Sequence, residues 1–187
     1  MTVTSRASVG YPVRSATLED APPIATIYND AVATTVATFD TEPRSLEAQR
    51  AWLQQHRAPF TVLVVEDAGA VVGWASLSPW SDRKAYAGTA EVSVYVAGTH
   101  RGRGCGGELM DRLVSASDAA GFHTLIARVA EPNPASRRLH ERRGFVSVGV
   151  MHEVGWKFDR WVDVRIFQRL FALPRADGLP APGPAQS

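Results

Sequence analysis

A glycine-rich stretch in the middle of the chain has the residue types that bind phosphate groups. Residues 100–109 read HRGRGCGGEL and lead into an apolar run with helical spacing. Glycine leaves main-chain N–H groups open to phosphate oxygens, and a helix N-terminus adds favourable partial positive charge. Arg101 and Arg103 add full positive charges. The pattern Arg101-x-x-Gly104-x-Gly106 therefore predicts a loop that holds a diphosphate.

Three other interpretations fit the same glycines less well. Gly102-x-Gly104-x-x-Gly107 matches the dinucleotide-binding fingerprint, and Glu131 lies where a ribose-binding acid is expected. In that fold, however, a strand runs straight into the glycines near the start of the domain, whereas several elements come first here. A P-loop is excluded because Glu108 follows the last glycine in place of Lys-Ser or Lys-Thr. A flexible turn that only ends or caps a helix is the plainest alternative.

The composition is that of one globular domain without a broad basic surface. The 187 residues are 45% hydrophobic and 21% charged, with a formal net charge of +1, which is not typical of a nucleic-acid-binding protein. Cys105 is the only cysteine, so no intramolecular disulfide can form, a zinc site would need histidines, and a reducing compartment fits. No segment reaches about eighteen consecutive apolar residues, and the N-terminus lacks the apolar core of a signal peptide. We expect a cytoplasmic protein that binds neither nucleic acid nor membrane.

The two ends of the chain differ in composition from the part between them. Residues 1–12 are small and polar, and residues 172–187 are rich in Pro, Gly and Ala. Such segments cannot bury enough apolar surface to fold. We therefore predict disordered ends around a domain at 13–171.

Periodicity within the domain predicts strands and helices in the order βααβββαβαββ, a mixed α/β sheet without an internal repeat. Ala68-Gly69 predicts the turn of a hairpin, and Asn133-Pro134 predicts a helix N-cap followed by proline at the first helical position. In the strand at 90–97, odd-numbered and even-numbered side chains lie on opposite faces. The expected strands are 13–16, 60–67, 70–78, 90–97, 124–130, 145–154 and 161–170, and the expected helices are 21–33, 45–56, the run from Leu109 to Gly121, and 134–143.

With these elements in place, the chain resembles the GNAT superfamily of acyl-CoA-dependent N-acetyltransferases, whose (Arg/Gln)-x-x-Gly-x-(Gly/Ala) loop holds the coenzyme A diphosphate. The resemblance extends from Val13 to Leu170 and includes the order of the elements. Within the superfamily the likeness is strongest to the phosphinothricin and methionine sulfoximine acetyltransferases. It is carried by IYNDAV, TFDTEP, SPW followed by Arg83 and Tyr86, VSVYV, LHERRGF and VGWKFDRWVDV.

The resemblance implies an α/β (α+β) GNAT fold with a mixed central sheet of about six to seven strands flanked by about four helices. It also implies acetyl-CoA as co-substrate, no metal, and a homodimer. The pantetheine arm would run beside the strand before the loop and pair with its main chain. The positions that would bind acetyl-CoA are Val94, Tyr95, Val96, Arg101, Gly102, Arg103, Gly104, Cys105, Gly106, Gly107, Asn133 and Ser136.

Acetyl transfer from a thioester to an amine requires a neutral nitrogen, a polarised carbonyl and a stabilised thiolate. An α-ammonium has a pKa of about 7.7–8.0, so a nearby carboxylate can remove its proton. The resemblance implies that Glu91 is this base, directly or through water. It also implies that His140, with a reference pKa of about 6.5, occupies the place where the wider superfamily often has a tyrosine that protonates the departing sulfur. Outside this context Glu91 is an exposed residue of a strand edge, and His140 is a solvated or capping histidine.

Two positions of the acetyl-CoA site also have structural interpretations. Asn133 is expected to cap the helix that begins at Pro134, and the resemblance adds a contact to pantetheine or to bound water; Ser136 is a weaker candidate for the same wall. Cys105, at a helix N-terminus, invites a covalent mechanism. We expect instead that its side chain turns toward the core, because the family usually has an apolar residue there, and that transfer is direct.

The acceptor site is expected beside Glu91. The resemblance assigns the loop with Arg83 and Tyr86 to amino-acid-like substrates, and arginine binds carboxylate through two parallel hydrogen bonds. A solvated surface charge is the alternative for Arg83. Phe39, Trp80 and Ser93 would line the same pocket.

Several aromatic and charged residues near the C-terminal end have no assigned role in the site. Trp156 and Trp161 are expected in the core, where aromatic residues are more frequent, and Lys157 and Asp163 match the terminal motif without a known role. Trp156 and the pair Asp82-Arg83 depart from the phosphinothricin consensus. The identity of the acceptor therefore stays open.

Together these features predict an N-acetyltransferase that acts on phosphinothricin, methionine sulfoximine or methionine sulfone. A polyamine, aminoglycoside or protein N-terminus acetyltransferase is the nearest alternative, although Arg83 and Lys84 favour an anionic acceptor. A non-catalytic CoA-sensing module and a dehydrogenase are further alternatives.

Overall fold

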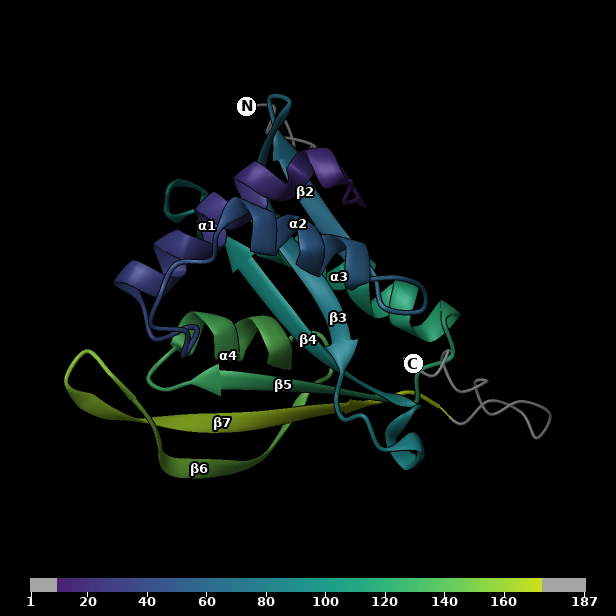
Figure 1. The fold of residues 1–187 in the computed structure, drawn as a ribbon. Coiled ribbons are helices and arrows are strands. Elements are labelled where there is room, and N and C mark those ends of the chain that lie inside the picture. Colours follow the sequence, from purple (N-terminus) through teal and green to yellow (C-terminus); the bar gives the residue numbers. More distant parts are fainter. Residues whose placement is uncertain (1–9, 173–187) are drawn as a thin grey trace, which may run out of the picture.

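The computed structural model describes residues 10–172, and a seven-stranded mixed sheet runs through this part of the chain (Figure 1). The strands lie in the order β1-β2-β3-β4-β5-β7-β6. Neighbouring strands are antiparallel except β4 and β5, which are parallel. The strand bounds are β1 (Val13–Ser15), β2 (Val62–Asp67), β3 (Ala70–Pro79), β4 (Thr89–Val96), β5 (Thr124–Ala130), β6 (Val146–Lys157) and β7 (Arg160–Leu170).

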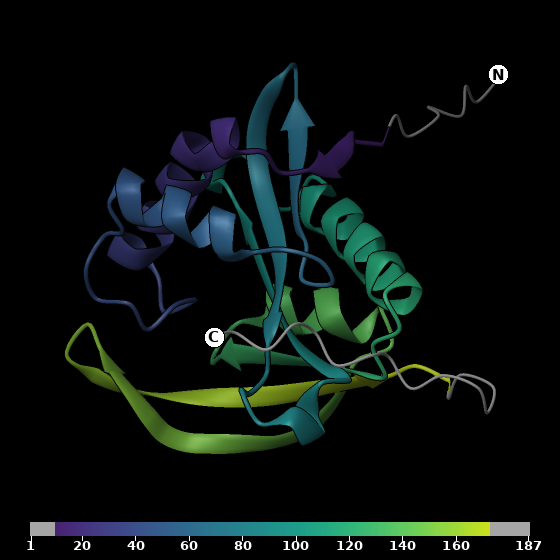
Figure 2. The same ribbon diagram turned by 45° about the vertical axis from the view of Figure 1, so that its right-hand side comes forward.

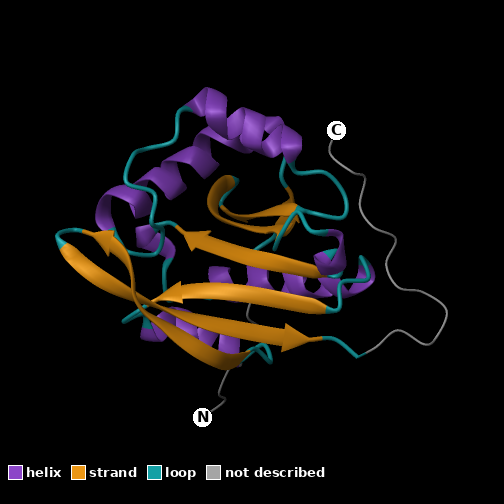
Figure 3. Cartoon of the chain, turned by 60° about the horizontal axis from the view of Figure 1, so that its bottom comes forward, coloured by secondary structure: helices purple, strands orange, loops and turns teal. Residues whose placement is uncertain are grey.

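Helices cover both faces of the sheet (Figures 2 and 3). α1 (Ala21–Thr34) and α2 (Leu46–Gln55) pack on one face, and α3 (Cys105–Ala119) and α4 (Pro134–Glu141) pack on the other. Along β2, Val62 and Val64 face α1 while Leu63 and Val65 face α3, so this strand is apolar at successive positions. Within residues 10–172 the chain also forms three short 3-10 helices, η1 (Leu18–Asp20), η2 (Lys84–Tyr86) and η3 (Gly98–His100).

Turn and cap residues begin and end these elements where the sequence predicts. The Ala68-Gly69 turn has φ angles of 48° and 80°, which joins β2 to β3 as a hairpin. Asn133 Oδ1 accepts a hydrogen bond from Ser136 N at 3.0 Å, so Asn133 caps α4 as expected. Gly144 follows α4 with a φ of 74°, a left-handed conformation that favours glycine.

The parallel pair β4–β5 splits, and this split positions the site. The two strands pair only from Thr89 with Thr124 to Glu91 with Ile126. Beyond these residues β4 turns away from β5 toward α1, as the diverging arrows of Figure 1 show. The edge of β4 that faces β5 is therefore unpaired after Glu91, and the last paired residue of β4 is the predicted base.

The mixed sheet, the four helices and the order of elements confirm the predicted fold class. The segment 1–12 is predicted to be disordered, but Tyr11 and Pro12 near its end contact the folded domain. Pro12 O accepts a hydrogen bond from Glu66 N at 3.0 Å, and Tyr11 packs against the core on the α3 side. The predicted disorder of 1–9 and 173–187 lies outside the described residues.

Candidate active site

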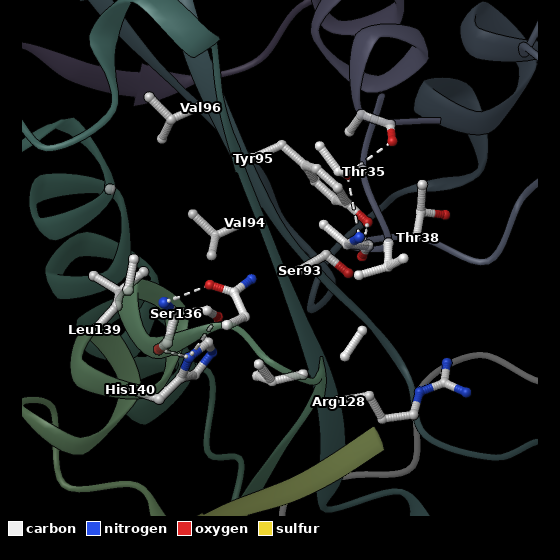
Figure 4. A pocket seen from close by; sticks show the side chains of 18 of the residues that line it. Thr35, Thr38, Ser93, Val94, Tyr95, Val96, Arg128, Ser136, Leu139 and His140 are labelled. Carbon is white, nitrogen blue, oxygen red and sulfur yellow. Dashed lines mark hydrogen bonds between the residues drawn. The ribbon is translucent and has the colours of Figure 1, made fainter. Parts of the chain in front are cut away.

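A cleft of about 1430 Å³ opens between the split strands β4 and β5 (Figure 4). β4 and the loop between α1 and α2 form one wall, and β5 with α4 forms the other. The glycine-rich start of α3 lies at one end of the cleft, and the turn of the β6–β7 hairpin lines it as well. The cleft thus joins the predicted diphosphate loop to the predicted base.

The glycine loop has a backbone that other residues adopt only with strain. Gly102 has a φ of 75°, and Gly104, the N-cap of α3, has a φ of 102°. Glycine at these positions turns the chain from β4 into α3. Arg101 Nε donates to Val96 O at 3.1 Å, which holds the loop against the end of β4.

The structure brings most, but not all, of the predicted acetyl-CoA-binding residues to the cleft. Arg103 and Cys105 are the two loop positions that do not line it. The Cys105 side chain is buried in the core on the α3 side, as predicted, and burial raises the pKa of its thiol. The predicted positions that line the cleft are Val94, Tyr95, Val96, Arg101, Gly102, Gly104, Gly106, Gly107, Asn133 and Ser136.

Side chains alternate along β4 as the sequence predicts. Tyr95 stacks on Trp74 with 4.8 Å between ring centroids, and its hydroxyl donates to Ala37 O at 3.3 Å. Burial raises the pKa of Tyr95, so its hydroxyl stays protonated at physiological pH. Val94 and Val96 pack on the opposite face, against the core that contains α3. Ser93 lines the cleft from the same side of β4 as Tyr95 (Figure 4).

Glu91 lies at the fork of β4 and β5 and forms a bidentate ion pair with Arg128 of β5. Arg128 Nε donates to Glu91 Oε1 at 2.5 Å, and Nη2 donates to Oε2 at 2.8 Å. Both residues line the cleft. The sequence interpretation did not single out Arg128, although it is the only charged residue in the otherwise largely apolar run 124–130. That isolated charge was the available signal.

His140 is buried at the cleft wall and is not a solvated surface residue. Its side chain stacks on Phe167 and meets Phe145 edge to face, with ring centroids at 5.7 and 5.2 Å. Nδ1 lies 2.8 Å from Ser136 O, so Nδ1 carries a proton and donates to that carbonyl, which leaves Nε2 as an acceptor in the neutral ring. Burial lowers the pKa of His140, and the nearby Arg143 acts in the same direction. The ring is therefore neutral at physiological pH.

Because burial lowers the pKa of His140 below its reference value of 6.5, the folded protein binds this proton less readily than the unfolded chain. Stability is therefore complete above 6.5 and falls as the pH decreases from 6.5 through the lower folded-state value. We expect His140→Gln to lose less stability than the wild type between pH 7.5 and 5.5, measured by urea unfolding. His56→Gln is the positive control, because His56 is a second histidine whose pKa is lowered by burial, and it lies outside the cleft. An equal acid-dependent loss in wild type and His140→Gln contradicts this assignment.

The loop between α1 and α2 forms a wall of the cleft because Lys157 of β6 holds it. Lys157 is buried, and its Nζ donates to Thr38 O at 2.8 Å. The Tyr28 hydroxyl contacts Thr38 Oγ1 and donates to Asp40 Oδ2 at 2.6 Å. Phe39, a predicted pocket residue, lines the cleft; a Cβ atom added at Gly155 would clash with its ring. Lys157, which had no assigned role, thus positions this wall.

Three predicted substrate-binding residues do not reach the cleft. Trp80, Arg83 and Tyr86 lie on the connection between β3 and β4, which includes η2, and none of them lines the cleft within residues 10–172. The pairing of β3 with β4 continues beyond the fork, on the side where β4 is still paired with β5. The connection between β3 and β4 begins only after this pairing ends, so the connection projects from the end of the sheet (Figure 1). Arg83 of this chain therefore does not contact the pocket that holds Glu91.

The expectation that Trp156 and Trp161 belong to the core is wrong. They pack edge to face with centroids 5.3 Å apart, but their residues remain 53% and 57% exposed. β6 is an edge strand, and its outer side has no covering layer within the described residues. Asp163 has a local role, because it accepts hydrogen bonds from His152 Nδ1 and Glu153 N in the β6–β7 hairpin.

Within 10–172, no group of three or more His, Cys, Asp or Glu side chains converges as metal ligands do. None of the helices there combines the length and hydrophobicity required to cross a bilayer.

The split sheet, the glycine-rich helix start and the carboxylate at the fork define a class of enzyme that transfers acyl groups. Residues 24–145 match the model of the Acetyltransferase (GNAT) family. The chain belongs to this family and is an N-acetyltransferase.

Proteins of known activity and structure support the narrower resemblance. The chain is 40% identical over 158 residues to an L-methionine sulfoximine/L-methionine sulfone acetyltransferase of Pseudomonas aeruginosa, covering 83% of this chain and 92% of that protein. It is 42% identical over 161 residues to a phosphinothricin N-acetyltransferase of Streptomyces coelicolor, covering 84% and 94%. The crystal structure of a phosphinothricin acetyltransferase from Sinorhizobium meliloti in complex with AcCoA superimposes with a TM-score of 0.87 at 31% identity, covering 94% of this chain and 95% of that one. The predicted relationship is confirmed.

Proposed function

We propose that this enzyme transfers an acetyl group from acetyl-CoA directly to the free amine of a small amino-acid-like compound. Phosphinothricin, L-methionine sulfoximine and L-methionine sulfone are the candidate acceptors. The main support is that one continuous cleft joins the glycine-rich start of α3 to Glu91 at the β4–β5 fork. The relatives named for these compounds support the same choice.

Acetyl-CoA fits the cleft because diphosphate and pantetheine would meet different main-chain groups. The first turn of α3 offers N–H groups beside side-chain-free glycines, and a helix N-terminus favours negative charge. The unpaired edge of β4 would bind the pantetheine arm as an added strand. Asn133 and Ser136 face it from the start of α4. When bound, acetyl-CoA supplies the acetyl group as an activated thioester.

Glu91 acts as the base in this proposal. It accepts the proton of the acceptor's ammonium, directly or through one water, so that a neutral nitrogen attacks the thioester. A main-chain N–H of β4 donates to the carbonyl oxygen, where negative charge develops. The neutral ring of His140 presents Nε2 as an acceptor, so we assign His140 to proton acceptance or positioning and not to protonation of the departing sulfur.

An assay of CoA release with a panel of amines tests this function. The panel contains the three candidate acceptors together with a polyamine, an aminoglycoside and an N-terminal peptide. We expect turnover of at least one of the three amino-acid-like compounds and little turnover of the cations. Turnover of a cation alone would assign a different acceptor class. Binding of acetyl-CoA without turnover of any amine would favour a CoA-sensing module.

We also infer a homodimer in which a second copy covers the edge strand β6. Val148 and Trp156 of β6 and Trp161 of the adjoining strand β7 expose 54%, 53% and 57% of their surface, and exposed apolar side chains gathered on one pair of strands indicate a protein interface. Val148→Glu is expected to convert the dimer to monomer in sedimentation velocity. The control is Ala119→Glu, at an exposed position of α3, which is expected to stay dimeric. A wild-type monomer, or a dimer unaffected by Val148→Glu, overturns this surface.

We infer that the enzyme works in the cytoplasm. Its only cysteine is a buried free thiol, which suits a reducing compartment. The acyl donor in the proposed reaction suits the same compartment.

A further inference from the structure

Arg128 offers two separate hydrogen-bonding edges, and only one of them is used. Nε and Nη2, along one side of the guanidinium, both donate to Glu91. A guanidinium has five N–H donors in a fixed plane, so three remain: both hydrogens of Nη1 and one of Nη2. No other residue in 10–172 accepts them. Two of these donors, one on Nη1 and one on Nη2, form the end of the guanidinium, which can bind a second carboxylate.

The unused end of Arg128 is accessible from the cleft. The Arg128 side chain is 55% exposed, whereas that of Glu91 is 17% exposed. Figure 4 shows Arg128 at the end of the cleft below Ser93, on the side away from His140. Two cleft arginines nearer the glycine loop already have partners, since Arg101 donates to Val96 O and Arg143 to Asp111 Oδ2.

Resting on the proposed function, we propose that Arg128 is the anion anchor of the acceptor: its free end binds the acceptor's carboxylate while its side edge holds Glu91. One planar group then fixes both the base and the substrate. In an α-amino acid the amine and the carboxylate are attached to the same carbon, so a carboxylate bound to this end brings the amine beside Glu91. Glu91 keeps lone pairs for the proton, because the ion pair uses two of its roughly four acceptor positions.

This arrangement selects a substrate class. An amine without an adjacent anionic group forms no charge-assisted hydrogen bond with the free end of Arg128, so it binds less well. Arg128 thereby takes the role that the sequence assigned to Arg83, whose side chain does not reach the cleft. The proposed class is α-amino acids with a free carboxylate.

The test compares L-methionine sulfone with its carboxamide, which keeps the amine and side chain but has no negative charge. Loss of a charge-assisted hydrogen bond gives a roughly 10- to 150-fold preference of the wild type for the acid in kcat/KM. We expect Arg128→Gln to reduce this ratio to nearly one, mostly through the KM for the acid. Arg128→Lys, which keeps a charge without the two edges, is expected to give an intermediate ratio. Acetyl-CoA binding by calorimetry checks that each variant is folded.

Matched variants separate this proposal from its alternatives. Arg160→Gln removes another cleft arginine that does not contact Glu91, and Arg83→Gln removes the arginine predicted from sequence. Both are expected to keep the preference for the acid. The proposal is overturned if Arg128→Gln slows acid and amide equally, since Arg128 then only positions Glu91. It is also overturned if Arg83→Gln abolishes the preference, or if the wild type has none. If the wild type acetylates no amine at all, the proposed function itself fails.

Discussion

Replacing Glu91 with glutamine is expected to lower kcat by about 10²- to 10⁴-fold, the usual contribution of a general base. Glutamine has nearly the same shape but cannot accept the ammonium proton. The expected loss is in kcat, because the substitution leaves the glycine loop and the α4 wall of the cleft unchanged. Steady-state CoA release with saturating acetyl-CoA and L-methionine sulfone measures it.

A second glutamate of the chain supplies a matched control. Glu131 forms an ion pair with Arg165 at 2.6 Å, and its side chain is 17% exposed, as is that of Glu91. Glu131→Gln therefore removes a similar glutamate–arginine pair away from the cleft lining. We expect Glu131→Gln to keep kcat within a few-fold of the wild type. A similar rate in Glu91→Gln and wild type would exclude Glu91 as the base.

The rate of Glu91→Gln at raised pH distinguishes direct catalysis from a structural effect. The α-amine at a peptide N-terminus has a reference pKa of about 7.7–8.0, and the α-amine of a free amino acid has a higher one, so in either case more of the amine is neutral at high pH. If Glu91 only removes the proton, the variant recovers activity as pH rises from 7 to 9. If the variant instead has a misplaced acceptor, its rate relative to wild type stays constant with pH.

The secondary structure was predictable because its signals are local. Alternation along 90–97 placed Glu91, Ser93 and Tyr95 on one face, and Asn133-Pro134 marked the start of α4. The glycine pattern located the start of α3, because only glycine adopts the φ of 102° at Gly104 without strain. Each of these features depends on a few neighbouring residues.

The parts that could not be predicted depend on pairing between distant residues. The end of β4–β5 pairing at Glu91 and Ile126 is set by the whole sheet, and no local pattern indicates it. The ion pair with Arg128 follows from this register, because Arg128 lies two residues beyond Ile126 on the same face of β5. The family motif suggested that Arg83 reaches the pocket, but the extended β3–β4 pairing carries that residue past the fork. Motif position alone therefore placed both Glu91 and Arg83 at the pocket, whereas in the structure Glu91 lines the cleft and Arg83 does not.

Replacing Gly106 with aspartate is expected to weaken acetyl-CoA binding by about 10²- to 10³-fold. Gly106 is the second residue of α3 and lines the cleft, so a carboxylate there would face the bound diphosphate. Two like charges about 4 Å apart near a protein surface repel by about 4 kcal/mol before screening by salt. Calorimetric titration of acetyl-CoA measures the loss, which is expected to shrink at higher ionic strength.

The same substitution is expected to leave the fold intact or to stabilise it, and this separates a binding effect from misfolding. Aspartate in the first turn of a helix interacts favourably with the helix dipole, by about 0.3–1 kcal/mol, and glycine is a poor helix former. Gly106→Ala is the matched control: its Cβ would lie 3.6 Å from Val96 Cγ2, an ordinary van der Waals contact. We expect both variants to unfold at or above the wild-type temperature while only the aspartate loses affinity strongly. Equal acetyl-CoA affinity in Gly106→Asp and Gly106→Ala would mean that the diphosphate does not bind at the start of α3, because a negative charge at this position repels any phosphate held by the adjacent main-chain N–H groups.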